Sequence, residues 1–135
     1  MKQETQKSVE AVQAMLAAFG KGDMEALKYS LSENTVWVYH GVEGIPYNGT
    51  YNGKDGAVQF IGNIISNVDI LDFQVANILA NGNTVVVLGS EKQKIKSNGQ
   101  VLEQSWVQVY AVENNLIIRM EEYANTAHSL KLFQG

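Results

Sequence analysis

Apolar residues follow a helical period in the first half of the chain and mostly an alternating one in the second. Near the start they recur every three or four positions, as on one face of a helix; these residues are Val9, Val12, Leu16 and Phe19. A second run at this spacing consists of Val58, Ile61, Ile64 and Ile65. The spacing predicts helices over about 3–19, 23–29 and 55–67, the last two capped by Asp23 and Asp55.

Alternating and β-branched segments predict strands elsewhere. The stretch TVWVYH, residues 35–40, is rich in residues that favour strands. After residue 68 we expect four long strands, separated by the turn sequences NGN, SNGQ and ENN. A short helix over about 126–133, capped by Asn125, follows the last strand. Helices followed by an antiparallel meander predict an α+β fold with its helices on one face of the sheet, and we expect residues 1–135 to form a single domain.

Neighbouring residues of a strand point to opposite faces, so the last strand, LIIRMEEY, can be divided into two sets. The set that is apolar until its final member is expected to face inward; it consists of Leu116, Ile118, Met120 and Glu122. The set expected to face outward consists of Ile117, Arg119, Glu121 and Tyr123. The carboxylate of Glu122 is therefore expected to point toward the core. A β-bulge within this strand would instead turn Glu121 inward and Glu122 outward.

Two further strands carry polar residues on faces that are otherwise apolar. Glu91 and Gln93 share the face of Val85 and Val87. This arrangement indicates either a polar site or, the interpretation we favour, a hairpin end that projects beyond the core. In VLEQSWVQVYAV, amides alternate with large aromatic residues on one face, a mixture typical of a pocket or an interface. That face carries Leu102, Gln104, Trp106, Gln108 and Tyr110.

Composition and charge narrow the range of functions. The 135 residues carry a formal net charge of −4 and include no cysteine and only two histidines, His40 and His128. A disulfide framework and a thiolate metal site are therefore excluded, and a histidine-rich zinc centre is not expected. No basic patch indicates a nucleic-acid partner, and no apolar stretch approaches the roughly 20 residues of a membrane span. The N-terminus lacks the apolar core of a secretory signal, so we expect a cytoplasmic protein.

Four stretches resemble the nuclear transport factor 2-like superfamily, and within it the SnoaL-like and ketosteroid-isomerase-like small enzymes. They are AFGKGDMEAL, TVWVYHG, IPYNGTYNGKDGAVQFI and NNLIIRMEEYANTA. The resemblance covers about residues 9–132 and implies a cone, in which a strongly curved antiparallel sheet wraps around the N-terminal helices and encloses a central apolar cavity. It also implies a homodimer formed through the outer sheet face, where Val107 and Val109 would otherwise be exposed.

The resemblance implies functional roles for only some residues of this chain. Glu122 falls where the limonene epoxide hydrolase group keeps an acidic residue, but that group's companion Arg and Asp would fall near Glu91 and Gln93, which do not match. The base of the ketosteroid isomerases would fall at Tyr39 or His40, and either of these could enter the cavity. The isomerases' two oxygen-binding donors have no counterpart, so steroid isomerisation in that form is not expected.

These observations together predict a function. A glutamate in an apolar cavity has its charged form disfavoured, so its pKa rises toward the range useful for proton transfer. We expect Glu122 and His40 to be catalytic in a cofactor-independent isomerase, lyase/cyclase or hydrolase that acts on a small hydrophobic compound, in a cavity of roughly a few hundred Å³ with His40 at its mouth or inside. The residues expected to bind the substrate are Trp37, Tyr39, Phe60, Trp106, Gln108, Met120 and Tyr123. The alternative is a non-catalytic domain that binds a small molecule or serves dimerisation. No metal, organic cofactor, nucleic acid or membrane is expected as a partner.

Overall fold

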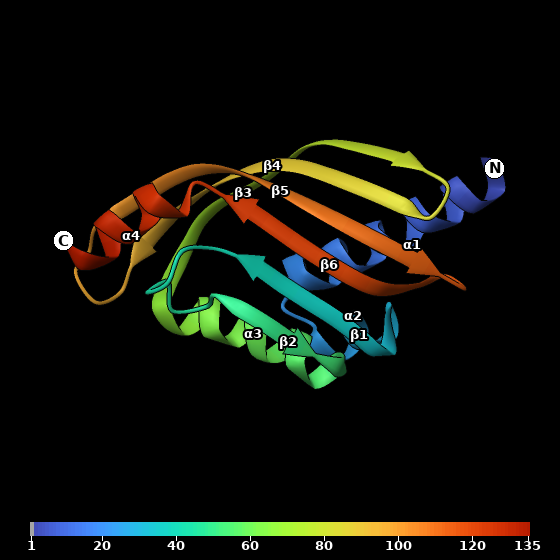
Figure 1. Cartoon of the computed structure of the whole chain (residues 1–135), viewed down its shortest axis with the longest axis horizontal. Helices are drawn as coiled ribbons and strands as arrows, with labels where there is room; N and C mark the ends of the chain where they lie inside the picture. Colours follow the sequence, from blue (N-terminus) through green and yellow to red (C-terminus); the bar gives the residue numbers. More distant parts are fainter. Residues whose placement is uncertain (1) are drawn as a thin grey trace.

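Four helices and six strands make up the computed structural model, which describes residues 2–135 (Figure 1). In chain order they are α1 (Lys2–Lys21), α2 (Met24–Tyr29), β1 (Leu31–His40), β2 (Gly49–Asn52), α3 (Gly53–Asn67), β3 (Val68–Asn81), β4 (Thr84–Ile95), β5 (Val101–Glu113), β6 (Leu116–Ala124) and α4 (Thr126–Gln134). The predicted α+β class is confirmed, and each predicted helix and long strand is present. The short strand β2 was not predicted. Among the described residues, none of the helices combines the length and apolar character that crossing a membrane requires.

The six strands form one sheet in the order β2-β1-β6-β5-β4-β3. Every neighbouring pair is antiparallel except β1 and β6, which are parallel. The prediction of a purely antiparallel sheet is therefore wrong at this pair. In the chain, α3 and four strands (β2 to β5) separate β1 from β6, so no tight turn forces the two to run in opposite directions.

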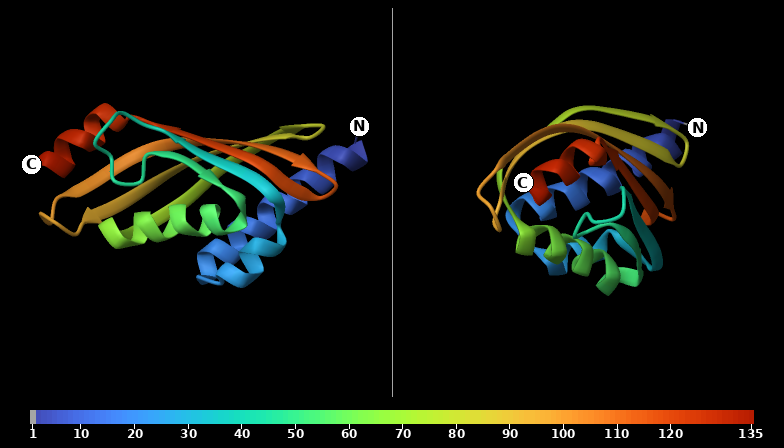
Figure 2. Two further views of the ribbon diagram at one scale, coloured as in Figure 1. Left: turned by 60° about the horizontal axis from the view of Figure 1, so that its bottom comes forward. Right: turned by 60° about the vertical axis from the view of Figure 1, so that its left-hand side comes forward.

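The sheet curves over the helices without closing on itself. Figure 2 shows the strands arching over α1, with α3 lying across the side that the sheet leaves open. The concave face and these two helices bury a common apolar core. Its members include Val12, Met15, Phe60, Val85, Trp106, Tyr110 and Met120.

A β-bulge in β6 changes the predicted division of that strand. Ala111 of β5 pairs with Arg119, but the next residue, Val112, pairs with Ile117, so one residue of β6 is left over. Ile117 is consequently fully buried while Leu116 and Ile118 are half-buried, which corrects the prediction for the start of the strand. The bulge lies before Met120, so Met120 and Glu122 still face inward as predicted, and Glu121 faces outward.

Two of the three predicted helix caps are confirmed. Asp23 accepts a hydrogen bond from the backbone N–H of Ala26, and Asn125 accepts one from that of His128. Asp55 does not cap α3, because the helix begins two residues earlier, at Gly53. The Asp55 carboxylate instead forms an ion pair with the Lys28 ammonium at 3.1 Å.

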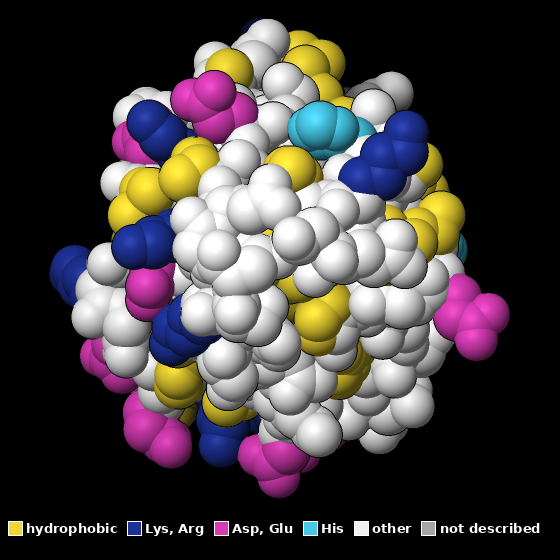
Figure 3. Space-filling model, turned by 90° about the vertical axis from the view of Figure 1, so that its left-hand side faces the viewer, with side chains coloured by type: hydrophobic (Ala, Val, Ile, Leu, Met, Phe, Trp, Pro, Cys, Tyr) yellow, Lys and Arg dark blue, Asp and Glu magenta, His cyan; other side chains and the backbone are white. Residues whose placement is uncertain are grey.

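The loop between β1 and β2 and the last helix close one end of the arch. Tyr47 of the loop is buried, and its ring lies 6.0 Å from that of Phe133 in α4. The backbone N–H of Val42 donates to the hydroxyl of Thr126, the first residue of α4. Figure 3 views this end: charged side chains lie around the rim, and hydrophobic ones show between uncharged groups near the middle.

Candidate active site

Strand register brings two carboxyl groups onto the concave face. Glu122 of β6 lies between Tyr39 of β1 and Gln108 of β5, its direct partners on either side. Four residues away from Gln108 along β5, Gln104 pairs with Glu91 of β4. Since directly paired residues point to the same face, the two glutamates and the two glutamines all project under the arch.

Glu122 is buried at the end of a short hydrogen-bond chain. The Tyr110 hydroxyl donates to Gln108 Oε1 at 2.6 Å, and Gln108 Nε2 donates to Glu122 Oε1 at 3.0 Å. Only 6% of Glu122 is exposed. Burial and, to a smaller extent, the charge of Glu91 raise the pKa of its carboxyl, the bond from Gln108 opposes the rise, and the resulting pKa is about 8. Glu122 is therefore largely protonated at neutral pH.

Glu91 lies in a different environment. Its two oxygens accept hydrogen bonds from Gln93 Nε2 at 2.8 Å and Gln104 Nε2 at 2.6 Å. Burial raises the pKa of this carboxyl too, but both amide donors stabilise its charged form and oppose the rise. Because the two carboxyls repel each other when both are charged, Glu91 takes the negative charge first and Glu122 keeps its proton.

A small hollow lies beside these groups, between the concave face and helices α1 and α3. Its volume is about 50 Å³, room for one or two water molecules. The residues that line it are Met15, Leu16, Phe19, Trp37, Phe60, Ile61, Ile64, Ile70, Phe73, Glu91, Gln108, Tyr110 and Glu122. The volume is well below the few hundred Å³ expected, because aromatic side chains from helix and sheet pack across the space, as Trp37 and Phe60 do with ring centroids 6.1 Å apart.

Four buried hydrogen-bond donors near this region have no hydrogen-bond partner among residues 2–135. They are the hydroxyls of Tyr39 and Tyr47 and the indole N–H groups of Trp37 and Trp106. Burial, with the nearby charges of Glu91 and Glu122 adding to it, raises the pKa of both tyrosines, which keeps these phenols neutral; at Tyr39 the nearby Gln104 amide opposes the rise without a hydrogen bond of good geometry. Neutral phenol and indole groups can donate to an oxygen of a bound molecule. No group of three or more His, Asp or Glu side chains within residues 2–135 is arranged to hold a metal ion.

Of the nine residues predicted for the site, four line the hollow. These four are Glu122, Trp37, Phe60 and Gln108. The remaining inward residues are buried next to it without lining it; they are Tyr39, Trp106 and Met120.

His40 and Tyr123 were expected at the cavity, and the structure places both elsewhere. Tyr39 points inward, so its neighbour His40 points to the outer face, where its Nε2 lies 2.8 Å from Glu121 Oε1. The His40 and Tyr123 rings stack there at 4.6 Å. The expectation that His40 occupies the mouth or interior of the cavity is wrong, and Tyr123, which is 43% exposed, does not reach the hollow either.

Glu91 and Tyr47 are the residues that sequence reasoning missed. Glu91 was placed on the inward face, but the hairpin was expected to project beyond the core. Gln93, two residues further out, is 2% exposed, so that interpretation is wrong. The available signal was the polar pair Glu91 and Gln93 directly after buried valines. Tyr47 gave no such signal, because its burial depends on how the loop folds onto α4.

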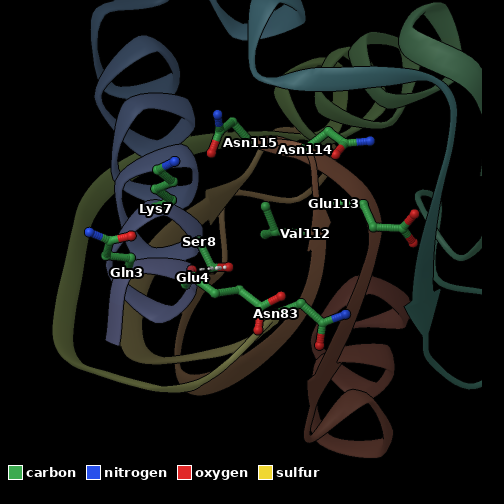
Figure 4. A pocket seen from close by; sticks show the side chains of 9 residues that line it. All are labelled: Gln3, Glu4, Lys7, Ser8, Asn83, Val112, Glu113, Asn114 and Asn115. Atoms are coloured by element: carbon green, nitrogen blue, oxygen red, sulfur yellow. Dashed lines mark hydrogen bonds between the residues drawn. The ribbon is translucent and has the colours of Figure 1, made fainter. Parts of the chain in front are cut away.

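A larger hollow of about 400 Å³ lies apart from the carboxyl pair, between the start of α1 and two hairpin turns (Figure 4). Its lining is mainly polar: Gln3, Glu4, Lys7, Ser8, Asn83, Val112, Glu113, Asn114 and Asn115. The buried hydroxyl of Ser8 already donates to the backbone oxygen of Glu4 at 2.9 Å. None of the unpartnered buried polar atoms of the described residues belongs to this lining, so the hollow lacks the convergent groups of a binding site.

Solved structures with the same fold are numerous. An NTF2-like protein from Burkholderia xenovorans LB400 matches with a TM-score of 0.85 and 24% sequence identity, over 96% of this chain and 97% of that one. A candidate SnoaL-like polyketide cyclase from Jannaschia sp. CCS1 matches with a TM-score of 0.81 and 14% identity, over 97% and 94%. A protein with a ketosteroid isomerase-like fold from Catenulispora acidiphila DSM 44928, solved in complex with trimethylamine, matches with a TM-score of 0.76 and 14% identity, over 93% and 92%.

Sequence comparison identifies the family. No curated protein matches the chain. The family model of the SnoaL-like domain matches residues 12–120, which is most of the chain. The protein therefore belongs to the SnoaL-like domain family.

Proposed function

We propose that this protein is a cofactor-independent enzyme that uses Glu122 for acid–base chemistry on a small hydrophobic compound, as an isomerase, a lyase/cyclase or a hydrolase. The observation that carries the proposal is the buried Glu122 carboxyl, whose pKa of about 8 keeps it protonated at neutral pH at the wall of a mainly apolar hollow. A carboxyl with such a pKa can give or take a proton near neutral pH, and this requires no metal or organic cofactor.

The second carboxyl gives the pair complementary roles. Neutral Glu122 donates a proton or hydrogen bond to a substrate oxygen, while charged Glu91 removes a proton from the same molecule. Environments that separate the protonation states of two neighbouring acids are typical of such acid–base pairs. The unpartnered hydroxyls of Tyr39 and Tyr47 are further donors for a substrate oxygen. One structural neighbour is described as a candidate polyketide cyclase, which supports carbonyl compounds as the first class to test.

The test is turnover of a panel of uncharged cyclic ketones, enones and epoxides by the wild type and by Glu122→Gln. This variant removes the titrating proton while its amide oxygen can still accept the bond from Gln108. Turnover should fall by about two to four orders of magnitude, the usual contribution of a general acid–base residue, while binding persists. Glu121→Gln, the outward neighbour, is the matched control and should retain activity. Equal turnover by the wild type and Glu122→Gln would contradict the proposal.

The alternative is a module that binds a small apolar molecule without converting it. The volume of about 50 Å³ is far smaller than a typical small-molecule pocket and does not separate the two functions, because an enzyme and a binding module would both need more room. For such a module, Glu122→Gln would change affinity only, and the wild type would turn over no compound of the panel.

We also propose that the protein forms a homodimer through the convex face of the sheet. Paired rows of apolar side chains cross that face: one contains Leu79, Val86 and Val109, and the next contains Leu88, Val107 and Tyr123. Leu79 is 52% exposed in the single chain. An apolar sheet face of this kind can pair with its own copy about a twofold axis, and a stable dimer would need to cover about 800 Å² on each chain.

A further inference from the structure

A second apolar hollow adjoins the first on its helical side. Its volume is about 160 Å³, and it lies where the end of α1, the start of α2 and the middle of α3 meet. The lining contains no charged side chain and consists of Phe19, Gly22, Met24, Val58, Ile61, Gly62 and Ile65. We call it the outer hollow, and the 50 Å³ hollow at the carboxyl pair the inner hollow.

Phe19 and Ile61 line both hollows, so these two side chains form the wall between them. Ile61 is buried, whereas Phe19 is half-buried and lies in the last turn of α1. The Phe19 ring contacts that of Phe73 with centroids 5.2 Å apart, and Phe73 stacks on Trp106 at 5.1 Å. A shift of the Phe19 ring would therefore join the two hollows. It would also change the packing of Phe73 against Trp106.

The other end of the arch is closed. Tyr47 and Ile45 of the β1–β2 loop are buried against the core, and the loop is hydrogen-bonded to α4 through Val42 and Thr126. The glycine loop thus covers the end where the mouth was expected. On the helical side, by contrast, the two hollows share the side chains of Phe19 and Ile61, so this side offers a route from solvent toward Glu122.

We propose that the outer hollow is the entrance to the candidate active site, that Phe19 is its gate, and that the molecule admitted is uncharged, with an oxygen function at one end and an apolar body. The inference rests on the proposed site at Glu122. Polar groups gather at its deep end, where Glu91, Glu122 and Gln108 lie, while the entrance is apolar. A ligand therefore enters with its oxygen first and leaves its apolar body between α1 and α3.

A larger side chain in place of Gly62 would block this route. A Cβ built at Gly62 has no neighbouring atom within 4 Å, so a side chain there extends into open space at the outer hollow. Gly62 lies inside α3, where leucine is a better helix former than glycine, so Gly62→Leu should not lower the melting temperature. Gly20 in α1 is the matched control: it is also helical with open space around it, but it does not line either hollow.

The experiment measures association of 2-acetylnaphthalene, an uncharged aromatic ketone, by stopped-flow quenching of the protein's two tryptophans. Trp37 lines the inner hollow and Trp106 stacks on Phe73, so both report on a ligand beside the carboxyl pair. Gly62→Leu should lower the association rate constant by about tenfold or more, within the range over which such constants vary among variants of one site. Gly20→Leu should match the wild type, and Phe19→Ala should associate faster. The anion 2-naphthoate, of similar shape, should not bind.

Three results would overturn the inference: no binding of 2-acetylnaphthalene, equal binding of 2-naphthoate, or an association rate in Gly62→Leu equal to that of the wild type or Gly20→Leu. The outcome is separable from that of the proposed chemistry. If Gly62→Leu slows binding but the wild type turns over no compound, the entrance stands and the catalytic proposal fails. If turnover depends on Glu122 but binding is indifferent to Gly62, the enzyme stands and the entrance lies elsewhere.

Discussion

Replacing Glu122 by glutamine should change the pH dependence of folding in a direction that the structure fixes. The carboxyl of Glu122 has an ordinary pKa of 4.5 and a pKa of about 8 in the folded protein, mainly because of burial. Between these values the folded chain holds a proton that the unfolded chain has lost. The free energy of unfolding must therefore decrease as the pH rises through this window.

The size of the effect follows from the same two values. The free energy of unfolding should fall by roughly 1.4 kcal/mol per pH unit within the window, and by roughly 5 kcal/mol across it. This is an upper limit, because water that reaches the charged carboxylate would lower the folded pKa. Total stabilities are commonly about 5–15 kcal/mol, so the protein should be markedly less stable at pH 9 than at pH 5.

Urea unfolding at a series of pH values from 4 to 9 or so, monitored by tryptophan fluorescence, measures this slope directly. In Glu122→Gln the contribution is absent, so the variant should gain stability over the wild type as the pH rises. Glu121→Gln is the control on the same strand. Bonds from Arg119 and His40 lower the pKa of Glu121, so the stability it contributes is present at neutral pH and is lost only at acidic pH.

The reasoning would be refuted by parallel stability profiles of the wild type and Glu122→Gln between pH 5 and about 8. That result would mean that the carboxyl is hydrated and titrates near its ordinary pKa. A slope in both Glu122→Gln and the wild type would instead assign the extra proton to another group, of which Glu91 is the first candidate because burial raises its pKa as well.

Three further predictions concern other parts of the molecule. Gly89→Ala should cost about 1–3 kcal/mol in urea unfolding, because a Cβ there would overlap the Trp106 ring and the backbone oxygen of Gln74; an unchanged midpoint would mean that the sheet yields at this point. His40→Gln should leave turnover of any compound found with the panel within about twofold of the wild type, since His40 faces away from Glu122; a larger loss would restore the catalytic role first expected for it. Val107→Lys should convert the proposed dimer into a monomer in sedimentation velocity at micromolar concentration, and a wild type that is itself monomeric there would refute the proposed dimer.

Local patterns in the sequence were sufficient to predict most elements and the direction of the key carboxylate. Helical spacing identified α1 and α3, and turn residues separated the four long strands. Alternation placed Met120 and Glu122 on the buried face, and it held at those two positions because the bulge in β6 lies before Met120. The same rule failed at Leu116 and Ile118, since a single inserted residue reverses the faces on one side of it.

The site's surroundings depended on contacts between segments far apart in the chain. Whether Tyr39 or His40 faces Glu122 is decided by the parallel pairing of β1 with β6, which no local pattern specifies. Whether Glu91 lies over the core or projects beyond it was decided by the curvature of the sheet, which brings the β4–β5 hairpin back over the core. The volume left beside Glu122 was decided by how far the aromatic side chains of α1 and α3 reach under the arch. Periodicity records which face of each element is apolar, whereas register, curvature and packed volume arise only when distant elements meet, and these decide what a buried carboxyl can do.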